Sequence, residues 1–155
     1  MKSIGLRVTV VVEHQGSILL IKEKRSSREG FSLPGGQIEF LETIAEAARR
    51  EVWEETGLLV EMERLLWVDD RIEHTGEGKH TVGIGVLARL VGEQTDPIPG
   101  GLEDEQIEWA GWVPLEEWRT LPSLQGKVKN LVWGALAEAD YSPDYHGNVW
   151  EAQES

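Results

Sequence analysis

Apolar and polar residues alternate along several short stretches of the chain, a pattern typical of strands that bury one face. The first stretch, residues 6–13, carries one leucine and three valines on a single face. In a later stretch, residues 82–90, Gly83 and Gly85 lie opposite the apolar face, which indicates close approach by a backbone or a ligand. On these patterns, strands are predicted at residues 6–13, 17–22, 31–33, 58–67, 82–90 and 107–113.

Between the third and fourth of these strands, the apolar residues repeat with the period of a helix. Thr43 and Glu46 fit a capping box at its start, and Gly57 suits the left-handed position that follows a helix C-terminus. A short helix with proline in its first turn is predicted at residues 114–118, and a longer one at 127–139. Strands mixed with helices in this way predict an α/β layer sandwich.

The remaining stretches are polar or rich in glycine and proline, so they are predicted to be connections. Turns are expected at residues 14–16 and 34–36, and loops at 22–30, 69–80 and 92–105. Residues 141–155 show no periodicity, and we expect a tail there that is mobile or packed at an interface. The chain is therefore interpreted as one domain over residues 1–140 followed by that tail.

Composition and charge narrow the classes of function. Of the 155 residues, 40% are hydrophobic and 28% are charged, as in a soluble globular protein, and no apolar run approaches the roughly 20 residues of a membrane span. The formal net charge of −13 opposes binding to nucleic acid or to an anionic membrane, so we expect neither as a partner. The lack of cysteine excludes disulfides and thiolate catalysis and suits the cytoplasm. An anionic substrate would need metal ions to approach such a protein.

Three carboxylates, those of Glu51, Glu54 and Glu55, gather near the end of the first predicted helix. Offsets of three and four residues place them together on one face. Like charges at this spacing destabilise a helix by roughly 0.2–0.5 kcal/mol per pair. A bound divalent cation would explain the cluster, and the alternative is an ordinary amphipathic helix with a solvated acidic end.

Residues 36–58 resemble the Nudix box, a pattern of glycine, glutamate, arginine and aliphatic residues at fixed spacing. Every defined position is filled, by Gly36, Glu42, Arg50, Glu51, Val52, Glu54, Glu55, Gly57 and Leu58. The preceding strand pair, the Pro-Gly-Gly turn and residues 108–118 also look like this family's arrangement. By this resemblance Gly36 and Gly57 are structural. Arg50 is expected to be structural too, paired with Glu42 or Glu46.

The resemblance implies a Nudix hydrolase with an α/β fold, an α/β/α sandwich around a mixed β-sheet. Such an enzyme cleaves a nucleoside diphosphate linked to another moiety, so a small-molecule nucleotide is the expected partner: a nucleoside triphosphate, ADP-ribose or a nucleotide sugar. The implied cofactor is Mg2+, with Mn2+ as the other candidate, bound by Glu51, Glu54 and Glu55 and by the main-chain carbonyl of Gly35. Magnesium prefers carboxylate oxygens, keeps several waters and bridges protein to substrate phosphates.

The general base is left open between the box and a downstream loop. Glu51 or Glu54 is expected to contribute most to catalysis, with one loop acid assisting. The loop candidates are Glu103, Asp104 and Glu105. For each of these three the alternative is a solvated acidic turn.

An anionic substrate also needs cationic contacts from the protein itself. Candidates are Lys22, Lys24, Arg25, Arg28, Arg71 and Lys79, with solubilising surface charge as the alternative for each. Arg25 and Arg71 are preferred. Phe31 or Trp67 could hold a nucleobase, as aromatic side chains do in this family, although most of the seven tryptophans are expected in the core or at an interface.

Sequence marks that distinguish substrates within the family are mostly missing. The proline that ADP-ribose enzymes commonly carry about fifteen residues past the box is absent, and so is the tyrosine of dinucleoside polyphosphate hydrolases. A non-catalytic, nucleotide-sensing Nudix domain is the alternative function, although such domains often lose box carboxylates. The lack of cysteine argues against a related isomerase, which uses a catalytic cysteine. Homodimerisation, frequent in this family, would suit exposed tryptophans near the C-terminus.

Overall fold

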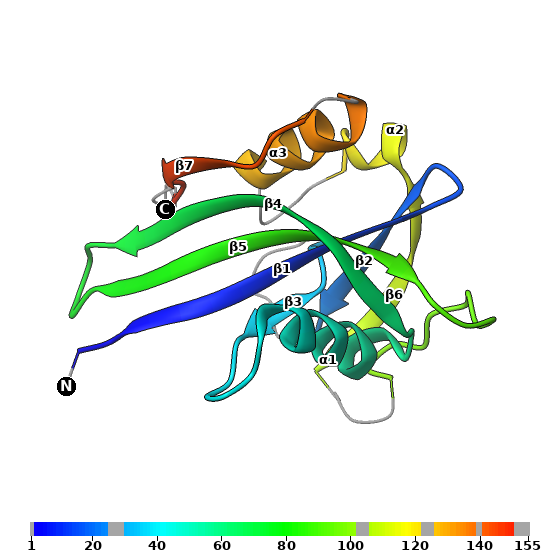
Figure 1. Cartoon of the computed structure of the whole chain (residues 1–155), viewed down its shortest axis with the longest axis horizontal. Helices are drawn as coiled ribbons and strands as arrows, with labels where there is room; N and C mark the ends of the chain where they lie inside the picture. Colours follow the sequence, from blue (N-terminus) through cyan, green and yellow to red (C-terminus); the bar gives the residue numbers. More distant parts are fainter. Residues whose placement is uncertain (1, 25–29, 102–105, 122–125, 139–140, 151–155) are drawn as a thin grey trace.

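The three longest strands are β1 (Ile4–His14), β4 (Val60–Glu73) and β5 (Lys79–Leu90). The computed structural model describes residues 2–24, 30–101, 106–121, 126–138 and 141–150. Within these ranges a 7-stranded sheet has the order β6-β2-β1-β5-β4-β7, and β3 also pairs with β1 (Figure 1). The shorter strands are β2 (Ser17–Glu23), β3 (Gly35–Gln37), β6 (Ile107–Pro114) and β7 (Asp144–Asn148). The β1–β5 and β4–β7 pairs are parallel and the others antiparallel, so the sheet is mixed.

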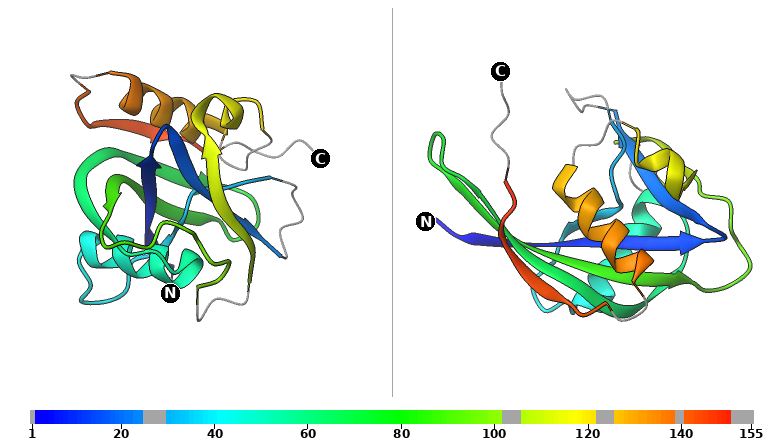
Figure 2. Two further views of the ribbon diagram at one scale, coloured as in Figure 1. Left: turned by 90° about the vertical axis from the view of Figure 1, so that its right-hand side faces the viewer. Right: turned by 90° about the horizontal axis from the view of Figure 1, so that it is seen from above.

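Helices cover both faces of this sheet (Figures 1 and 2). They are α1 (Ile44–Thr56), α2 (Leu115–Trp118) and α3 (Gly126–Ala137). The apolar stripe of α1 packs with Val10 and Val86 in one buried cluster. One cluster on the other face joins Trp118 of α2 and Val132 of α3 to Trp67. The expected α/β/α sandwich around a mixed sheet is confirmed.

The predicted ends of α1 are confirmed at the level of single hydrogen bonds. Thr43 precedes the helix, and its Oγ1 accepts from the main-chain N–H of Glu46 at 3.0 Å. Gly57 follows the helix with φ 71°, a left-handed conformation that glycine adopts without strain, and its N–H donates to the Trp53 carbonyl at 2.8 Å. These contacts fix where the helix that carries the box glutamates begins and ends.

The polar loop predicted at residues 69–80 is wrong. β4 continues to Glu73 and β5 begins at Lys79, so only residues 74–78 connect them, and the pairing runs without a break from Asp69–Gly83 to Glu73–Lys79. Polarity misled the prediction, because side chains of this stretch bond to one another, Arg71 to Asp69 along β4 and His80 of β5 to Asp70 across the strand pair. The extension places polar residues on a rigid sheet.

The Pro-Gly-Gly segment was also predicted wrongly, as a turn. Gly35–Gln37 form β3, which pairs with residues 7–9 of β1. A side chain is excluded at Gly35, because its Cβ would lie 2.2 Å from the carbonyl oxygen of Val8. The strand predicted at residues 31–33 reduces to an isolated bridge between Ser32 and Ile21.

The stretch without periodicity near the C-terminus contributes an edge strand. β7 pairs in parallel with β4 through Trp67–Asp144 and Asp70–Asn148, although its own sequence has no strand pattern. Among the described residues, no helix has the length and apolar character required to cross a membrane.

Candidate active site

The acidic side chains of α1 are arranged around Arg50. Its Nε and Nη2 donate to the two carboxylate oxygens of Glu42 at 2.7 and 2.9 Å, and Nη2 also donates to the Gln37 carbonyl at 2.9 Å. Its Nη1 donates to Glu51 at 2.8 Å and to Glu54 at 3.3 Å. Of the two partners expected for Arg50, the structure pairs it with Glu42. One guanidinium therefore ties the segment before α1 to two of the three helix glutamates.

These contacts and burial shift the pKa values of the acids in opposite directions. Hydrogen bonds from Arg50 lower the pKa of Glu42, and the same bonds raise the pKa of Arg50. Burial raises the pKa of Glu51, although hydrogen bonds from Arg50 act against the rise. At Glu51, whose side chain is only 13% exposed, the loss of water outweighs the ion pair.

The glycines of β3 let the chain approach the glutamates closely. The main-chain N–H of Gly35 donates to Oε1 of Glu55 at 2.8 Å, and this carboxylate is buried. A Cβ at Gly36 would lie 2.3 Å from Oε1 of Glu51, so any side chain there would displace that carboxylate. Gly36 therefore has a structural role in placing Glu51.

The chemistry of the donors around α1 fits a hard divalent cation. Carboxylate and carbonyl oxygens are the ligands that Mg2+ prefers. Glu51 and Glu54 already share one positive group, Nη1 of Arg50, so their oxygens can compensate a charge placed between them. In the part of the chain that the structure describes, no three acidic or histidine side chains converge as a metal-ligand cluster. Because Glu55 is bonded to Gly35, ligation by all three glutamates requires side chains to rearrange.

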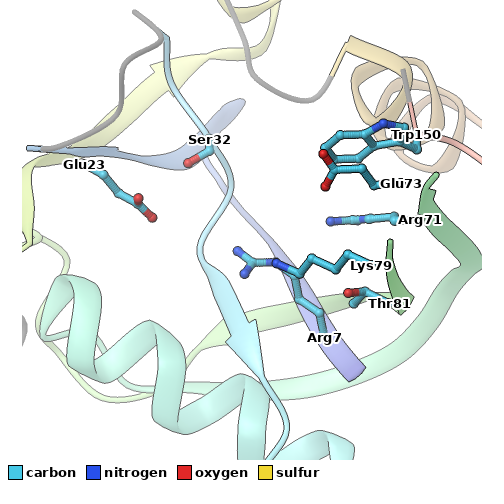
Figure 3. Close-up of a pocket in the computed structure, with 8 residues that line it drawn as sticks. All are labelled: Arg7, Glu23, Ser32, Arg71, Glu73, Lys79, Thr81 and Trp150. Carbon is cyan, nitrogen blue, oxygen red and sulfur yellow. The ribbon is translucent and has the colours of Figure 1, made fainter. Parts of the chain in front are cut away.

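A cavity of about 260 Å³ lies on the sheet (Figure 3). It is lined by Arg7, Glu23, Ser32, Arg71, Glu73, Lys79, Thr81 and Trp150. Trp150, Arg71 and Lys79 lie on one side, Glu23 and Ser32 on the other, and the Arg7 guanidinium points into the space between them (Figure 3). Among the described residues, three cationic and two acidic side chains thus line the cavity of a chain whose net charge is −13. A local excess of positive charge in this setting favours an anionic ligand.

Arg7 links the cavity to the glutamates of α1. Burial lowers the pKa of Arg7, and the charge of Arg71 lowers it further. The charges of Glu55 and Glu51 act in the opposite direction, so the guanidinium lies within electrostatic reach of both. Arg7 therefore couples the cationic cavity electrostatically to the acidic end of α1.

Arg71 is held in position by a buried carboxylate. Asp69 is fully buried and accepts from Trp67 Nε1 at 2.9 Å and from Arg71 Nε at 3.2 Å. Gly83 of β5 makes room for it, because a Cβ there would lie 2.3 Å from Oδ1 of Asp69. Nη2 of Arg71 is buried and has no hydrogen-bond partner within the described chain. A buried donor without a partner is costly, so this nitrogen is well suited to bind an anion from the cavity.

The residues predicted to contact the substrate do not all lie at this cavity. Arg71 lines the cavity as expected, whereas Phe31 packs edge-on against Trp109 with ring centroids 5.1 Å apart. The suggestion that Trp67 holds a base is wrong, because its ring is fully buried against Gly85. Five candidates lie outside the residues that the structure describes: Arg25, Arg28, Glu103, Asp104 and Glu105.

Six of the eight cavity residues were not proposed from the sequence, Arg7 and Trp150 among them. Arg7 did carry a signal, because it interrupts the apolar stretch of β1 on the face opposite Val8 and Val10. A charged side chain within a central strand is rarely buried without a partner or a function. Trp150 carried no such signal, since it follows a segment without periodicity.

Comparison with known proteins agrees with this geometry. The family model described as the NUDIX domain matches residues 4–132. The ADP-ribose pyrophosphatase of Methanocaldococcus jannaschii is 39% identical over 89 residues, which cover 57% of this chain and 52% of that protein. This chain therefore aligns with only about half the length of the archaeal relative.

Two further proteins align over larger shares of their length. Phosphatase NudJ of Escherichia coli (strain K12) is 30% identical over 110 residues, which cover 71% of this chain and 68% of that protein. The crystal structure of the MutT NUDIX hydrolase from Burkholderia pseudomallei superposes with a TM-score of 0.65 at 29% identity, covering 89% of this chain and 99% of the other. The resemblance first seen in residues 36–58 thus extends through most of the chain.

Proposed function

This chain belongs to the Nudix hydrolase family, and on that premise we propose that it hydrolyses a phosphoanhydride bond in a compound that links a nucleoside diphosphate to another moiety. The observation that carries the proposal is the cationic cavity beside the acidic end of α1. A diphosphate needs positive groups along its oxygens and a water activated next to its phosphorus. The cavity supplies the first requirement and the helix glutamates are suited to the second.

The cationic side chains would orient the substrate. Arg7 and Arg71 offer planar donor groups that match phosphate oxygens, and Lys79 adds a third charge at the same wall as Arg71. Asp69 already holds Nε of Arg71 in place. The side chain of Arg71 would therefore lose little conformational freedom when its unpaired Nη2 binds a phosphate oxygen.

The glutamates of α1 would hold the metal and receive the proton. Mg2+ bound by Glu51, Glu54, Glu55 and the Gly35 carbonyl would neutralise the diphosphate and lower the pKa of a bound water. In the reaction the water oxygen bonds to phosphorus, the bridging P–O bond breaks, and its electron pair leaves with the departing phosphate. Glu51 or Glu54 would accept the water proton, with Glu103, Asp104 or Glu105 assisting.

ADP-ribose is the first substrate to test among the three classes. The archaeal relative carries the name ADP-ribose pyrophosphatase, which supports this choice. The missing proline past the box argues against it, and NudJ, named only as a phosphatase, supports a broader range. Nucleoside triphosphates and nucleotide sugars therefore belong in the same assay.

The test measures the products released from ADP-ribose, nucleoside triphosphates, nucleotide sugars and dinucleotides with Mg2+ or Mn2+. We expect turnover of at least one compound, and a loss of about 10²-fold or more in kcat for Glu51→Gln or Glu54→Gln. Glu61→Gln is the matched control, because Glu61 lies on β4 in an exposed pair with Arg89. Binding without turnover for every compound and both metals would favour the nucleotide-sensing alternative. Wild-type rates in all of Glu103→Gln, Asp104→Asn and Glu105→Gln would exclude an assisting loop acid.

A further inference from the structure

We infer that Trp150 stacks on the base of the bound nucleotide and so favours ligands that carry a base over ligands that lack one. The inference rests on the proposed function, because it assigns a role in substrate binding at the same site. Trp150 is the aromatic side chain among those that line the cavity, and it lies on the same wall as Arg71 and Lys79 (Figure 3).

The backbone around Trp150 is fixed to the sheet. Oδ1 of Asn148 accepts from the main-chain N–H of Ile72 at 3.0 Å and from that of Trp150 at 3.1 Å. The N–H of Val149 donates to the Asp70 carbonyl at 2.9 Å. One asparagine thus joins Trp150 directly to β4, the strand that also carries Arg71. The position of the Trp150 backbone relative to the cationic wall is therefore fixed by these bonds.

A second contact holds β7 against the sheet. The Tyr145 hydroxyl donates to Asp70, whose other carboxylate oxygen lies 2.7 Å from Nε2 of His80 on β5. These bonds lower the pKa of Asp70, because they stabilise its charged form. The segment that carries Trp150 is thus bonded to Asp70 twice, through the Tyr145 hydroxyl to the carboxylate and through the Val149 N–H to the main-chain carbonyl.

The ring of Trp150 is available to a ligand. Trp150 as a whole residue is 38% exposed, whereas Trp67 and Trp118 are almost fully buried. Trp109 and Trp112 pack against other rings. Within the described part of the chain, no aromatic or cationic side chain stacks on Trp150. Exposed aromatic surface at a cavity is typical of a binding site, and flat heteroaromatic rings are the ligands that gain most from stacking on it.

The cationic side chains and Trp150 at this cavity match the two ends of a nucleotide. Arginine and lysine recognise phosphate, and an exposed indole recognises a base by stacking, which is tolerant of base identity. Removal of one base-stacking aromatic commonly weakens binding by about 10-fold, which corresponds to about 1.4 kcal/mol. Phe31 does not compete for this role, because its ring already packs against Trp109.

The test compares AMP with ribose 5-phosphate, which has the same phosphate and sugar but no base, by calorimetric titration with Mg2+ present. For the wild-type chain we expect AMP to bind about 10-fold more tightly than ribose 5-phosphate. Trp150→Ala is expected to weaken AMP binding by about that factor and to leave ribose 5-phosphate within about twofold. Trp133→Ala is the control, because Trp133 packs with Arg119 and does not line this cavity.

Two further variants keep the test decisive if the alanine variant does not fold. Trp150→Phe retains an aromatic face and should keep most of the preference for AMP, whereas Trp150→Leu retains only apolar bulk and should lose it. An unchanged preference in Trp150→Leu, an equal loss for both ligands, or no preference in the wild-type chain would each overturn the inference.

Hydrolysis is measured separately on the same variants, so the two proposals fail in different ways. A wild-type chain that turns over no compound, yet prefers AMP through Trp150, refutes the proposed function and leaves the base site. A chain that hydrolyses ADP-ribose while its preference for AMP is independent of Trp150 refutes the base site alone.

Discussion

The pair formed by Arg50 and Glu42 gives the sharpest prediction about how residues 36–58 hold the site together. Both oxygens of Glu42 accept from Arg50, at 2.7 and 2.9 Å. In Glu42→Gln one of these acceptors becomes an NH2 group that faces a guanidinium N–H. The substitution therefore removes a charge and sets two donors against each other, with almost no change in volume.

The magnitude follows from burial and charge. The side chains of Glu42 and Arg50 are 12% and 23% exposed, so water screens their interaction only in part. Hydrogen bonds to charged groups contribute about 1.5–3 kcal/mol each. Because Arg50 keeps its bonds to Gln37 and Glu51, we expect Glu42→Gln to lower the free energy of unfolding by about 2 kcal/mol. For a chain of this length that is a fall in Tm of about 4–8 °C.

The loss should also depend on pH. The pKa of Glu42 is lowered from its ordinary value of 4.5, so its contribution to stability is present above that value and disappears as the pH falls through the folded-state pKa. The wild-type chain and Glu42→Gln should therefore differ fully at pH 7. Their stabilities should approach each other as the pH falls below about 4.5.

Urea unfolding at several pH values measures this difference. Glu61→Gln is the control, because Glu61 pairs with Arg89 at 3.1 Å but the two side chains are 51% and 60% exposed. Exposed pairs contribute about 0–1 kcal/mol. If Glu42→Gln and Glu61→Gln lose the same stability at pH 7, Arg50 does not organise the site as described.

Three further outcomes are expected. Gly85→Ala should lower the free energy of unfolding by about 1–3 kcal/mol, because its Cβ would lie 2.2 Å from the Trp67 ring. Gly5→Ala is the control: its Cβ would lie 3.6 Å from the nearest atom, so the free energy of unfolding should change by less than about 0.5 kcal/mol. Equal urea midpoints for the two variants would contradict this. Asp69→Asn should raise KM by about 10-fold with little change in kcat. The asparagine amide has one acceptor oxygen in place of two, so it can hold only one of the Trp67 and Arg71 donors, and Arg71 is released. An unchanged KM in steady-state kinetics would show that Asp69 does not position Arg71 for the substrate. Chelation of divalent cations should abolish turnover, and added Mg2+ should restore it; full activity in the chelator would exclude a metal-dependent reaction.

What could be predicted from the sequence depends on how local each feature is. α1 was predicted closely, because its cap at Thr43, its apolar period and its terminal Gly57 all act within a few residues. The hairpin at residues 14–16 was predicted for the same reason: Gln15 and Gly16 adopt the left-handed conformations of a two-residue turn. Short-range signals of this kind do not depend on the rest of the fold.

The stretch at residues 69–80 was misread because its acidic side chains are satisfied by bonds that form only within the folded sheet. Asp69 bonds to Arg71 and Trp67 beneath Gly83, and Asp70 bonds to His80 and Tyr145. A polar strand and a polar loop have the same composition, and only tertiary contacts distinguish them. The same limit hid the cavity, whose lining residues lie between positions 7 and 150 and so show no spacing in the sequence.

The structure also changes the argument for a metal. The three glutamates of α1 first indicated a cation because like charges at that spacing repel, yet the protein itself supplies compensation: Arg50 donates to Glu51 and Glu54, and the Gly35 N–H donates to Glu55. The stabilising free energy of each contact equals or exceeds the repulsion of roughly 0.2–0.5 kcal/mol between a pair of glutamates. The acidic cluster alone therefore does not require a metal. The stronger reason for one is the position of the cluster next to Arg7, because a diphosphate held in the cationic cavity would lie close to carboxylates that repel it unless a divalent cation stands between them.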